Sequence, residues 1–445
     1  MAAKQHHADS DAQLLMTCFA MKPKIQSVVG MHDILPDDQK YYEKIYETAK
    51  EIADFYGFSR IETPILEDSD LFIKGTGMTT EIVQKQMFVF KTKGNDNVAL
   101  RPEGTPPVVR AYLQHGMANW PPPVKLWYWG PFFRYEKPQA GRYRQFWQLG
   151  FEAIGQGGAI IDAQIIQIYF NLLRELGLKD IAIEINSIGD AICRPQYRRA
   201  LAGYLKNRQN SLCADCRRRV KENPLRVLDC KEEKCQSVKA QAPQAVDHLC
   251  DECKKHCQEV LEYLEELGLP YRLNPYLVRG LDYYTRTVFE MFREGEGEKA
   301  PVALAGGGRY DALVKMMGGK ETFAVGGGMG VDRVVLAMKA ADIEIGKDKK
   351  VKVFLAQLGG LGKKKSLKLF EELRRAQIPT GEAFDRDSLK SQLRVADKYG
   401  ARYALLLGQK EALENTVILR DMESGKQEVL NFDAAVAEVK KRLRK

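Results

Sequence analysis

Arginine side chains that suit phosphate binding cluster in one short segment of the chain. Arg134 lies in an aromatic-rich run, and Arg142 and Arg144 follow a few residues later, just beyond Gly141. A planar guanidinium can form paired hydrogen bonds to phosphate oxygens, and a glycine lets a loop turn tightly between two strands. The spacing fits a phosphate-binding hairpin, but it fits an ordinary hairpin with a solvated basic loop equally well.

A second segment, residues 325–333, joins four glycines to the expected start of a helix. Glycines let a backbone approach a ligand closely, and a helix N-terminus favours anions. Arg333 would stand in the first helical turn, where a positive charge opposes the helix dipole, so its presence suggests a functional role. The spacing matches neither the dinucleotide-binding fingerprint nor the phosphate-binding loop of nucleotide hydrolases, and a plain glycine-rich turn is the alternative.

The chain contains nine cysteines, most of them between residues 213 and 257. An odd number without a recognisable secretory signal argues against a disulfide framework and favours a reducing, cytoplasmic compartment. Two C-x-x-C pairs stand out: Cys213 with Cys216, and Cys250 with Cys253. Two such pairs at a longer separation could together make a tetrahedral zinc site, or all of these thiols could be structural.

Composition narrows the class of protein. A chain of 445 residues with 44% hydrophobic and 29% charged residues is typical of a globular protein, with roughly two to four domains. No apolar stretch is long enough to span a bilayer. The formal net charge of +9 suits a polyanionic partner such as nucleic acid, although many basic proteins bind none.

Hydrophobic periodicity predicts the elements that position the basic hairpin. Two aromatic-rich strands, at 124–135 and 145–154, should flank its loop. Alternation along the first strand would place Arg134 and Glu136 on one face. Along the second strand, three residues would share a face: Gln148, Gly150 and Glu152.

The same patterns predict the remaining elements. One predicted helix spans 37–56, with Asp37 as its cap and Gly57 as its stop. A second opens at Pro106 after a cap at Thr105. Two more are predicted at 160–176 and 331–341. Predicted strands are 60–63, 98–101, 181–186, 277–292, 300–305 and 322–330. Residues 190–267 are helical, charged and cysteine-rich, which indicates an inserted subdomain. Beyond a charged linker at 346–350, strands and helices alternate, which implies a small parallel or mixed sheet.

Together, these segments resemble the motifs of one enzyme class. The hairpin at 133–148 and the glycine-rich segment at 325–333 resemble motifs 2 and 3 of class II aminoacyl-tRNA synthetases. The helix at 37–56 with the strand up to Pro64 resembles motif 1, which forms the dimer interface in that class.

Further segments narrow the resemblance to histidyl-tRNA synthetases. Residues 277–285 and 305–311 are similar to the two histidine-specific motifs of that family, and residues 99–105 fit it as well. The resemblance covers essentially residues 22–440. Two residues depart from the usual pattern: Val29, where arginine is frequent, and Trp147, where histidine is frequent.

The resemblance implies an α+β fold with a central antiparallel sheet in the catalytic domain, and an α/β anticodon-binding domain. The expected parts are a disordered N-terminal extension at 1–20, the class II catalytic domain at 21–189 and 268–345, a helical cysteine-rich insertion at 190–267, a linker at 346–350 and the anticodon-binding domain at 351–445. Because the family does not generally depend on zinc, we expect the cysteines to be reduced structural residues, with zinc as the alternative.

The resemblance also implies roles for individual residues. Arg134 and Arg279 would stabilise charge that develops at the ATP α-phosphate, and Arg279 would stand where related enzymes often use a metal ion. The residues expected to bind ATP are Arg134, Glu136, Arg142 and Arg333. Those expected to bind histidine are Glu103, Thr105 and Gln148 at its ammonium group, and Glu152, Tyr283, Tyr284 and Tyr310 at its imidazole.

The implied activity is that of a ligase. The carboxylate of histidine would attack the α-phosphorus of ATP, pyrophosphate would leave, and the terminal ribose hydroxyl of histidine tRNA would then attack the adenylate. Mg²⁺ on the β- and γ-phosphates, a homodimer and a cytoplasmic location are expected with it.

Three alternatives fit parts of the pattern. A regulatory paralogue that binds histidine would tend to lose the histidine-specific motif or the anticodon-binding domain, and both are present. A non-catalytic tRNA-binding module would not need all three arginines expected at ATP and the α-phosphate: Arg134, Arg279 and Arg333. A class II enzyme for another amino acid would not combine Glu152 and Tyr284 with the segment at 277–285.

Overall fold

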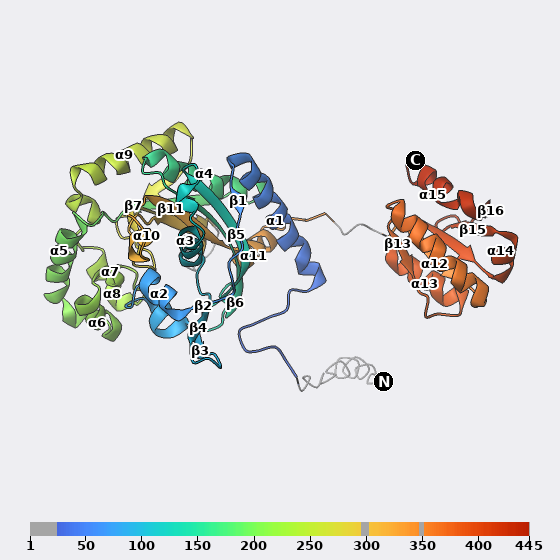
Figure 1. The fold of residues 1–445 in the computed structure, drawn as a ribbon, viewed down its shortest axis with the longest axis horizontal. Coiled ribbons are helices and arrows are strands. Elements are labelled where there is room, and N and C mark those ends of the chain that lie inside the picture. Colours follow the sequence, from blue (N-terminus) through green and yellow to red (C-terminus); the bar gives the residue numbers. More distant parts are fainter. Residues whose placement is uncertain (1–24, 295–301, 347–350, 445) are drawn as a thin grey trace, which may run out of the picture. The chain divides into compact units, whose positions relative to one another are not determined.

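The chain divides into two compact units, Met1–Glu344 and Ile345–Lys445, each built on its own β-sheet (Figure 1). The computed structural model describes residues 25–294, 302–346 and 351–444. The extension predicted at 1–20 and most of the linker predicted at 346–350 lie outside the described residues. In the described part of the chain, no helix is both long and apolar enough to cross a membrane. The predicted α+β class is confirmed.

An eight-stranded sheet forms the centre of the first unit. In spatial order its strands are β1 (Ser59–Arg60), β5 (Val124–Phe133), β6 (Gln145–Ile154), β11 (Ala324–Gly330), β10 (Ala303–Arg309), β9 (Thr285–Arg293), β7 (Ile181–Ser187) and β8 (Tyr271–Leu273). Neighbours are antiparallel from β5 to β7, and only the short edge strands β1 and β8 run parallel to their partners. The predicted central antiparallel sheet is therefore confirmed. A small second sheet contains β2 (Leu66–Asp68), β4 (Asn97–Leu100) and β3 (Phe88–Lys91).

Helices close one face of the large sheet. The helices of this unit outside the insertion are α1 (Pro36–Tyr56), α2 (Ser69–Thr76), α3 (Thr105–Gln114), α4 (Ala159–Glu175), α10 (Leu313–Met316) and α11 (Val331–Ala340). The apolar helix α4 packs across β7, β9, β10 and β11, and its Tyr169 hydroxyl accepts a hydrogen bond from the Phe151 N–H (3.0 Å). Because alternate residues of β6 point to opposite faces, Gln148 and Glu152 lie on the face away from α4.

The first helix begins and ends for different reasons. α1 starts at Pro36 and has no side-chain cap, so the prediction that Asp37 caps it is wrong. Proline is favoured at the first helical position because it has no N–H to satisfy, and Asp37 instead adds favourable negative charge in the first turn. Gly57 ends the helix in a left-handed conformation (φ 74°), as predicted.

Several strands differ in length from those that the sequence predicted. They are β1 (60–63 predicted), β5 (124–135 predicted), β9 (277–292 predicted) and β10 (300–305 predicted, partly outside the described residues). The largest error is at 277–284, which form a loop: the Asp282 N–H donates to the Thr76 carbonyl (3.1 Å), not to a neighbouring strand. Leu277 and Tyr283 are buried there, so a loop packed on the core produced a strand-like pattern.

The end of β5 corrects another prediction. The strand stops at Phe133, so Arg134 and Glu136 do not share a strand face. The Arg134 N–H still donates across the hairpin to the Arg144 carbonyl (2.9 Å), but the Glu136 N–H turns back to the Arg134 carbonyl (2.8 Å). The backbone therefore curls at Glu136 rather than continuing the ladder.

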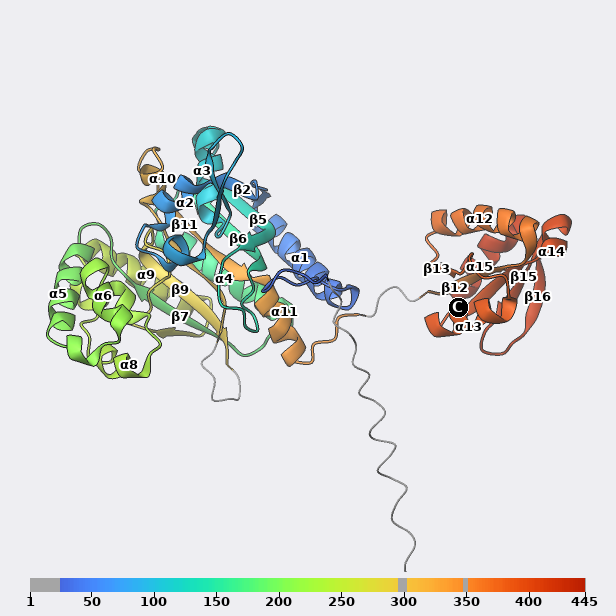
Figure 2. The same ribbon diagram turned by 90° about the horizontal axis from the view of Figure 1, so that it is seen from below.

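Residues 190–267 form a helical group beside β7 and β9 (Figure 2). Its helices are α5 (Arg194–Lys206), α6 (Ala214–Glu222), α7 (Leu225–Leu228), α8 (Glu233–Lys239) and α9 (Asp251–Glu266). α9 packs along α4, whereas α5 to α8 surround a small core of their own. Three cysteines belong to that core: Cys216, Cys230 and Cys235.

Asp162 joins the insertion to the sheet through a buried ionic cluster. Arg309 on β10 donates from Nε to one oxygen of Asp162 (3.2 Å) and pairs with the other, and both side chains are fully buried. His256 of α9 lies 3.3 Å from the same carboxylate. Burial acts to raise the pKa of Asp162, but Arg309 and His256 outweigh it, so the net pKa lies below the ordinary value.

Replacing Asp162 with alanine is expected to destabilise the protein by about 3–5 kcal/mol, because Arg309 would keep a buried charge without its main partner. The folded-state pKa of Asp162 is depressed. The stability that Asp162 contributes is therefore fully present above the pKa that it has in the unfolded chain. This stability is lost as pH falls through the lower pKa of the folded protein. Urea unfolding at neutral and acidic pH measures both effects. The exposed pair of Lys315 and Glu321 provides the control: Glu321→Ala should change stability by less than about 0.5 kcal/mol. An equal effect of the two substitutions would contradict the prediction.

The second unit contains a five-stranded mixed sheet, one of the two arrangements that the alternation predicted. Its strands in spatial order are β13 (Thr380–Glu382), β12 (Val353–Gln357), β14 (Tyr403–Leu407), β15 (Thr416–Asp421) and β16 (Gln427–Asn431). The first three are parallel, and the last two join antiparallel. Its helices are α12 (Gly359–Arg375), α13 (Leu389–Tyr399), α14 (Gln409–Glu414) and α15 (Ala435–Leu443). Successive residues of β12 enter two separate apolar clusters, so both faces of the sheet are covered.

Candidate active site

Glycines on β11 make room for polar side chains on β6. Gly326 pairs with Glu152, and a Cβ at Gly326 would lie only 1.8 Å from the Glu152 Oε2 atom. A Cβ at Gly328 would lie 2.2 Å from the Gln148 Nε2 atom. The glycine run therefore leaves space in which two polar side chains can lie across the strand, in addition to any approach by a ligand.

Glu152 is fully buried, and each of its oxygens accepts a hydroxyl hydrogen bond. Thr105 donates to Oε1 (2.7 Å) and Tyr310 donates to Oε2 (2.6 Å). The cap of α3 is Gly104, so the prediction that Thr105 caps this helix is wrong, because its hydroxyl is used by Glu152. Burial raises the pKa of Glu152 to about 8, although the bonds from Tyr310 and Thr105 act to lower it.

Glu103 is the second buried carboxylate. Its Oε1 atom accepts from the Thr105 N–H (3.1 Å) and from the Tyr283 hydroxyl (3.2 Å). Its Oε2 atom is buried and has no hydrogen-bond partner within the described residues. Burial raises the pKa of Glu103, while the Thr105 N–H and the positive charge of Arg134 act against it. A carboxylate oxygen left without a partner suits a cationic ligand group.

Aromatic side chains surround the two carboxylates. The Tyr283 ring lies 4.6 Å from that of Tyr284 and meets Tyr310 edge to face at 5.9 Å, measured between centroids. Gln148 donates from Nε2 to the hydroxyl of Tyr128 (3.0 Å), a buried residue that the sequence patterns did not single out. Such contacts fix the positions of these side chains before any ligand binds.

Positive charge gathers around the hairpin and the start of α11. Arg134 donates from Nε to a backbone carbonyl (2.8 Å), and its guanidinium lies 5.2 Å from the centroid of the Phe146 ring. Arg333 donates to two backbone carbonyls (2.9 and 3.0 Å). Burial lowers the pKa of Arg333, and the nearby charges of Arg142 and Arg134 add to this. Within the described part of the chain, only Glu136 pairs with Arg142, at 3.9 Å, so the group keeps an excess of positive charge that suits a polyanion.

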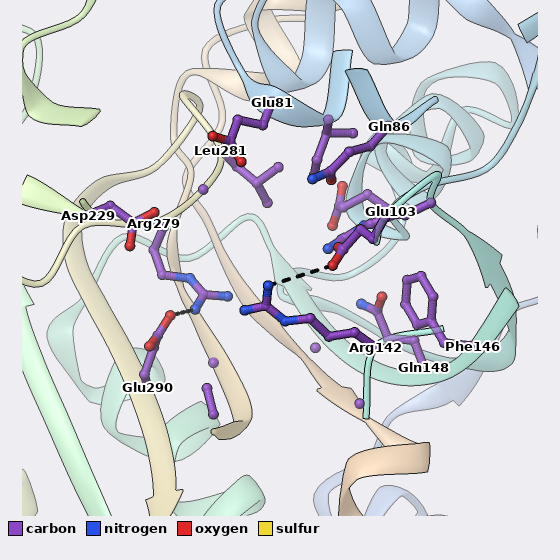
Figure 3. A pocket seen from close by; sticks show the side chains of 18 of the residues that line it. Glu81, Gln86, Glu103, Arg142, Phe146, Gln148, Asp229, Arg279, Leu281 and Glu290 are labelled. Atoms are coloured by element: carbon purple, nitrogen blue, oxygen red, sulfur yellow. Dashed lines mark hydrogen bonds and ion pairs between the residues drawn. The ribbon is translucent and has the colours of Figure 1, made fainter. Parts of the chain in front are cut away.

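Arg279 faces the same space from the loop before β9. Its guanidinium pairs with Glu290 of β9 and points toward the guanidinium of Arg142 (Figure 3). Burial acts to lower the pKa of Arg279, but the negative charge of Glu290 outweighs it and the net pKa is raised. The guanidinium therefore stays charged in a partly enclosed position.

The insertion adds pocket residues that were not predicted. Arg226 of α7 donates to the Arg279 carbonyl (2.9 Å) and to Oδ1 of Asp282 (2.7 Å), and so holds the loop that carries Arg279. Further lining residues from this subdomain are Arg218, Arg219, Glu222 and Asp229. The basic run at 217–219 was the available signal, but a charge run on a short helix is by default a solvated face.

One pocket brings together nine of the twelve predicted site residues: Glu103, Thr105, Arg134, Glu136, Arg142, Gln148, Arg279, Tyr284 and Arg333. The other three, Glu152, Tyr283 and Tyr310, lie behind its wall. They are linked to it through the hydrogen bonds to Thr105 and Glu103 described above. The predicted set is thus spatially continuous, although its members come from β6, α3, α11 and four loops.

The two residues that depart from the family pattern lie beside this pocket. Trp147 donates its N–H to Asp332 (2.6 Å) and packs its ring against Trp129 at 5.6 Å between centroids. Val29 is exposed, and its carbonyl accepts from Arg144 (3.2 Å). Both hydrogen bonds can form with other side chains at these positions, because each uses the backbone of the departing residue, whereas the ring contact with Trp129 requires an aromatic side chain such as Trp147.

A largely antiparallel sheet, closed by helices on one face, carries on its other face a pocket that combines a motif 2-like arginine hairpin with a glycine-rich strand running into a helix. This is the catalytic domain of a class II aminoacyl-tRNA synthetase. Sequence comparison refines the class: the family described as histidyl-tRNA synthetase matches residues 30–334, and the anticodon binding domain matches residues 352–442. The chain belongs to the histidyl-tRNA synthetase family.

Individual relatives agree with this family. A histidine–tRNA ligase of Dehalococcoides mccartyi is 43% identical over 418 residues, covering 94% of this chain and 100% of the relative. One of Thermodesulfovibrio yellowstonii is 44% identical over 398 residues, covering 89% and 94%. The crystal structure of apo S. aureus histidyl-tRNA synthetase matches with a TM-score of 0.78 and 34% identity, covering 94% of this chain and 100% of that one.

A more distant structure shares only the fold. An ATP phosphoribosyltransferase regulatory subunit/histidyl-tRNA synthetase from Bacillus halodurans matches with a TM-score of 0.62 and 21% identity. The fold alone therefore does not separate a tRNA-charging enzyme from a regulatory relative, and the side chains of the pocket must do so.

Proposed function

We propose that this chain is a histidine–tRNA ligase. It converts L-histidine and ATP into histidyl-adenylate and pyrophosphate, and then transfers histidine to the 3′-terminal ribose of histidine tRNA. The observation that carries the proposal is one pocket with two unlike parts. The buried carboxylate of Glu103 with hydroxyl and amide groups forms one part, and the buried Glu152 lies behind its wall. Arginines line the other part.

The carboxylate part fits histidine. The unpartnered Oε2 of Glu103, with Thr105 and Gln148, accepts the ammonium group. Glu152 receives an imidazole N–H, with the three tyrosines packed around it. Two oxygens of a carboxylate offer about four acceptor sites in all, so the bonds from Thr105 and Tyr310 leave capacity for this donor. A buried acceptor penalises amino acids without a matching N–H, which supports selection without editing.

The arginine part fits ATP. Arg134 and Arg279 stabilise the negative charge that develops at the α-phosphate, while Arg142, Glu136 and Arg333 hold the rest of the nucleotide. The carboxylate of histidine is already ionised at neutral pH, so its attack on phosphorus requires no general base. Alignment of the carboxylate with the leaving pyrophosphate is then the main task of the site.

Magnesium belongs to the proposal as part of MgATP. The two carboxylates closest to the ATP-facing arginines, Glu136 and Glu290, each pair with an arginine and are therefore already engaged. That donor set fits an ion held mainly by phosphate oxygens and water, as Mg²⁺ usually is. Its chemistry would be to neutralise charge on the β- and γ-phosphates.

Transfer to tRNA uses the same pocket. The terminal ribose hydroxyl attacks the carbonyl of the adenylate, and AMP leaves. The match of residues 352–442 to an anticodon binding domain and the net charge of +9 support a tRNA partner. We place the catalytic domain at 21–189 and 268–345, the insertion at 190–267, the linker at 346–350 and the anticodon-binding domain at 351–445.

Histidine-dependent ATP–pyrophosphate exchange tests the first step. Exchange should occur with histidine alone among the amino acids, and histidinol should inhibit it without supporting it, because histidinol lacks the attacking carboxylate. Charging of histidine tRNA tests the second step. A folded chain that binds ATP and histidine but shows no exchange would instead be a regulatory relative.

A homodimer is the expected assembly. Large apolar side chains are exposed over residues 25–90: Ile25, Val28, Val29, Leu35, Phe55, Ile65, Leu66, Met78, Val89 and Phe90. Monomeric proteins seldom leave many large apolar side chains exposed, and this set includes Phe55 on α1 and Leu66 on β2, which supports an interface formed by this part of the chain. Sedimentation at low micromolar concentration should detect a dimer, weakened roughly tenfold or more by Leu66→Asp, because the new charge would be buried without a partner.

A control for the dimer lies in the second unit. Val429 is similarly apolar and exposed on β16, and Val429→Asp should leave sedimentation unchanged. A wild-type chain that sediments only as a monomer at these concentrations would contradict the prediction.

We place the protein in the cytoplasm. All eight cysteines in the described part of the chain are free, which supports a reducing compartment. Fractionation of cells that express a tagged chain tests this location.

A further inference from the structure

Four cysteines of the insertion converge on one point. They are Cys213 and Cys216 at the start of α6, Cys230 after α7, and Cys235 on α8, and their sulfur atoms all lie within 4.8 Å of one another. The sequence suggested a different set, in which Cys250 and Cys253 would complete the site. That pairing is wrong, because those two cysteines belong to a separate group with Asp190 and Cys193.

The sulfur separations fit a tetrahedral metal site and not a disulfide. The Cys213 and Cys230 sulfur atoms are 3.9 Å apart. A disulfide would require about 2.05 Å. Four thiolates bound to Zn²⁺ at about 2.3 Å in a tetrahedron would be about 3.8 Å apart. The observed cluster, with every separation within 4.8 Å, is therefore close to the geometry of a zinc tetrathiolate.

Backbone N–H groups already point at two of these sulfur atoms. Cys216 donates its N–H to the Cys213 sulfur (3.4 Å), and Cys213 donates its own N–H to the Cys235 sulfur (3.3 Å). A thiolate is a much better acceptor than a thiol, which is only a weak one. A positive side chain is also close, since Lys239 donates to the Cys230 carbonyl (2.8 Å) and would offset the negative charge of four thiolates.

The surrounding subdomain has little else to hold it together. Its helices α6, α7 and α8 contain nine, four and seven residues, and helices shorter than about 12 residues are marginal on their own. The apolar core among them consists mainly of small and medium-sized side chains, three of them cysteines. Small subdomains of this kind usually need a disulfide or metal to remain folded.

We propose that Cys213, Cys216, Cys230 and Cys235 bind one Zn²⁺ ion, with release of four protons as the four thiols become thiolates. The ion would join α6, α7 and α8 into one rigid body. Cys213 is only partly buried, which leaves the metal a route of entry. This replaces the expectation, drawn from the sequence, that these cysteines are reduced structural residues.

The second group is a weaker candidate. One oxygen of Asp190 accepts from the N–H of Ile192 (3.0 Å), and the other pairs with Arg286 (3.3 Å). A carboxylate whose oxygens both serve the protein is poorly placed to become a ligand. Among the residues that the structure describes, the four sulfur atoms around Cys213 contact one another and backbone N–H donors, and a thiolate keeps such donors when it binds metal.

The site has a consequence for the active-site pocket. α7 carries Arg226, which holds the backbone of Arg279, and Arg219 of α6 donates to the Arg226 carbonyl (3.4 Å). Loss of the metal would loosen α7 and release the Arg279 loop. This consequence rests on the proposed function, whereas metal binding itself does not.

Metal analysis of the full chain tests the site. The chain is purified under reducing conditions with added ZnSO₄ and passed over a desalting column, and bound zinc is measured by mass spectrometry. The wild type should hold about one zinc per chain. Cys216→Ser should hold almost none, whereas Cys257→Ser, on α9 and outside both groups, and Cys250→Ser should retain it. No zinc in the wild type, or loss with Cys250→Ser and not with Cys216→Ser, would overturn the proposal.

Two measurements on the wild type guard against misfolded variants. Co²⁺ in place of zinc should give the intense near-ultraviolet sulfur-to-cobalt absorption and the visible bands of a tetrahedral tetrathiolate. Weak octahedral bands would contradict the site. Hydrogen exchange should show protection of residues 213–239 that is lost when a chelator removes the metal, while the large sheet stays protected. Neither readout depends on catalysis, so failure of the site and failure of the ligase proposal are distinguishable.

Discussion

Replacing Arg279 with alanine is expected to lower histidine-dependent ATP–pyrophosphate exchange by roughly 10²–10³-fold, the usual cost of removing one preorganised donor from a developing oxyanion. The effect should appear in kcat as well as in kcat/KM, because charge at the α-phosphate grows on the way to the transition state. Steady-state exchange at several histidine and ATP concentrations measures both.

The size of this effect follows from how Arg279 is held. Glu290 fixes one end of the guanidinium, the Tyr284 ring centroid lies 5.8 Å from it, and Arg226 fixes the backbone. Its raised pKa keeps the group charged throughout the reaction. A charge that is already in position needs no reorganisation when the phosphate develops its own charge. This preorganisation is the source of the rate enhancement expected from Arg279.

Two further variants separate catalysis from general disturbance. Arg279→Lys keeps the charge but loses the planar fork, so it should recover only part of the rate. Arg272→Ala removes an exposed arginine of β8 that pairs with Glu294, and it should leave exchange unchanged. If folded Arg279→Ala lost less than about threefold, the role of Arg279 at the α-phosphate would be refuted.

Local sequence patterns predicted the strands of the site because the alternation of residue types along a strand is a local property of the sequence. β6 was predicted correctly to the residue, since its aromatic and polar residues alternate on a sheet with one face covered by α4. Residues 277–284 gave a similar pattern without forming a strand. Their apolar side chains pack on the core from a loop held by the Thr76 carbonyl and by Arg226, and both partners are distant in sequence.

Contacts between distant segments account for what was missed. The reason for Gly326 and Gly328 became visible only once β11 was paired with β6, which places them against Glu152 and Gln148. The four cysteines of the cluster differ from the predicted set because spacing along the chain does not determine how short helices pack against one another. Arg226 carried no sequence signal at all, since its importance lies in the loop that it holds.

Replacing Glu152 with glutamine is expected to lower kcat/KM for histidine by roughly 10²-fold or more, while KM for ATP changes less than about threefold. The substitution preserves shape, but it replaces an acceptor oxygen with an NH₂ group. That group faces the Tyr310 hydroxyl and the proposed imidazole N–H as a competing donor. The exposed Glu321 supplies the control, since Glu321→Gln should change neither constant. Equal losses for histidine and ATP would contradict a role in amino-acid recognition.

The pH dependence of histidine binding tests the same residue in the unmodified enzyme. Burial raises the pKa of Glu152 in the free enzyme to about 8. Binding neutral imidazole to the ionised carboxylate therefore releases a proton below that pH. The dissociation constant for histidine should fall as pH rises from about 6.5, where imidazole becomes neutral, and level off above about 8. In Glu152→Gln the slope should vanish. A flat wild-type profile across this window would contradict the prediction, because it would mean that the proton stays in the complex, either on Glu152 or on the imidazole.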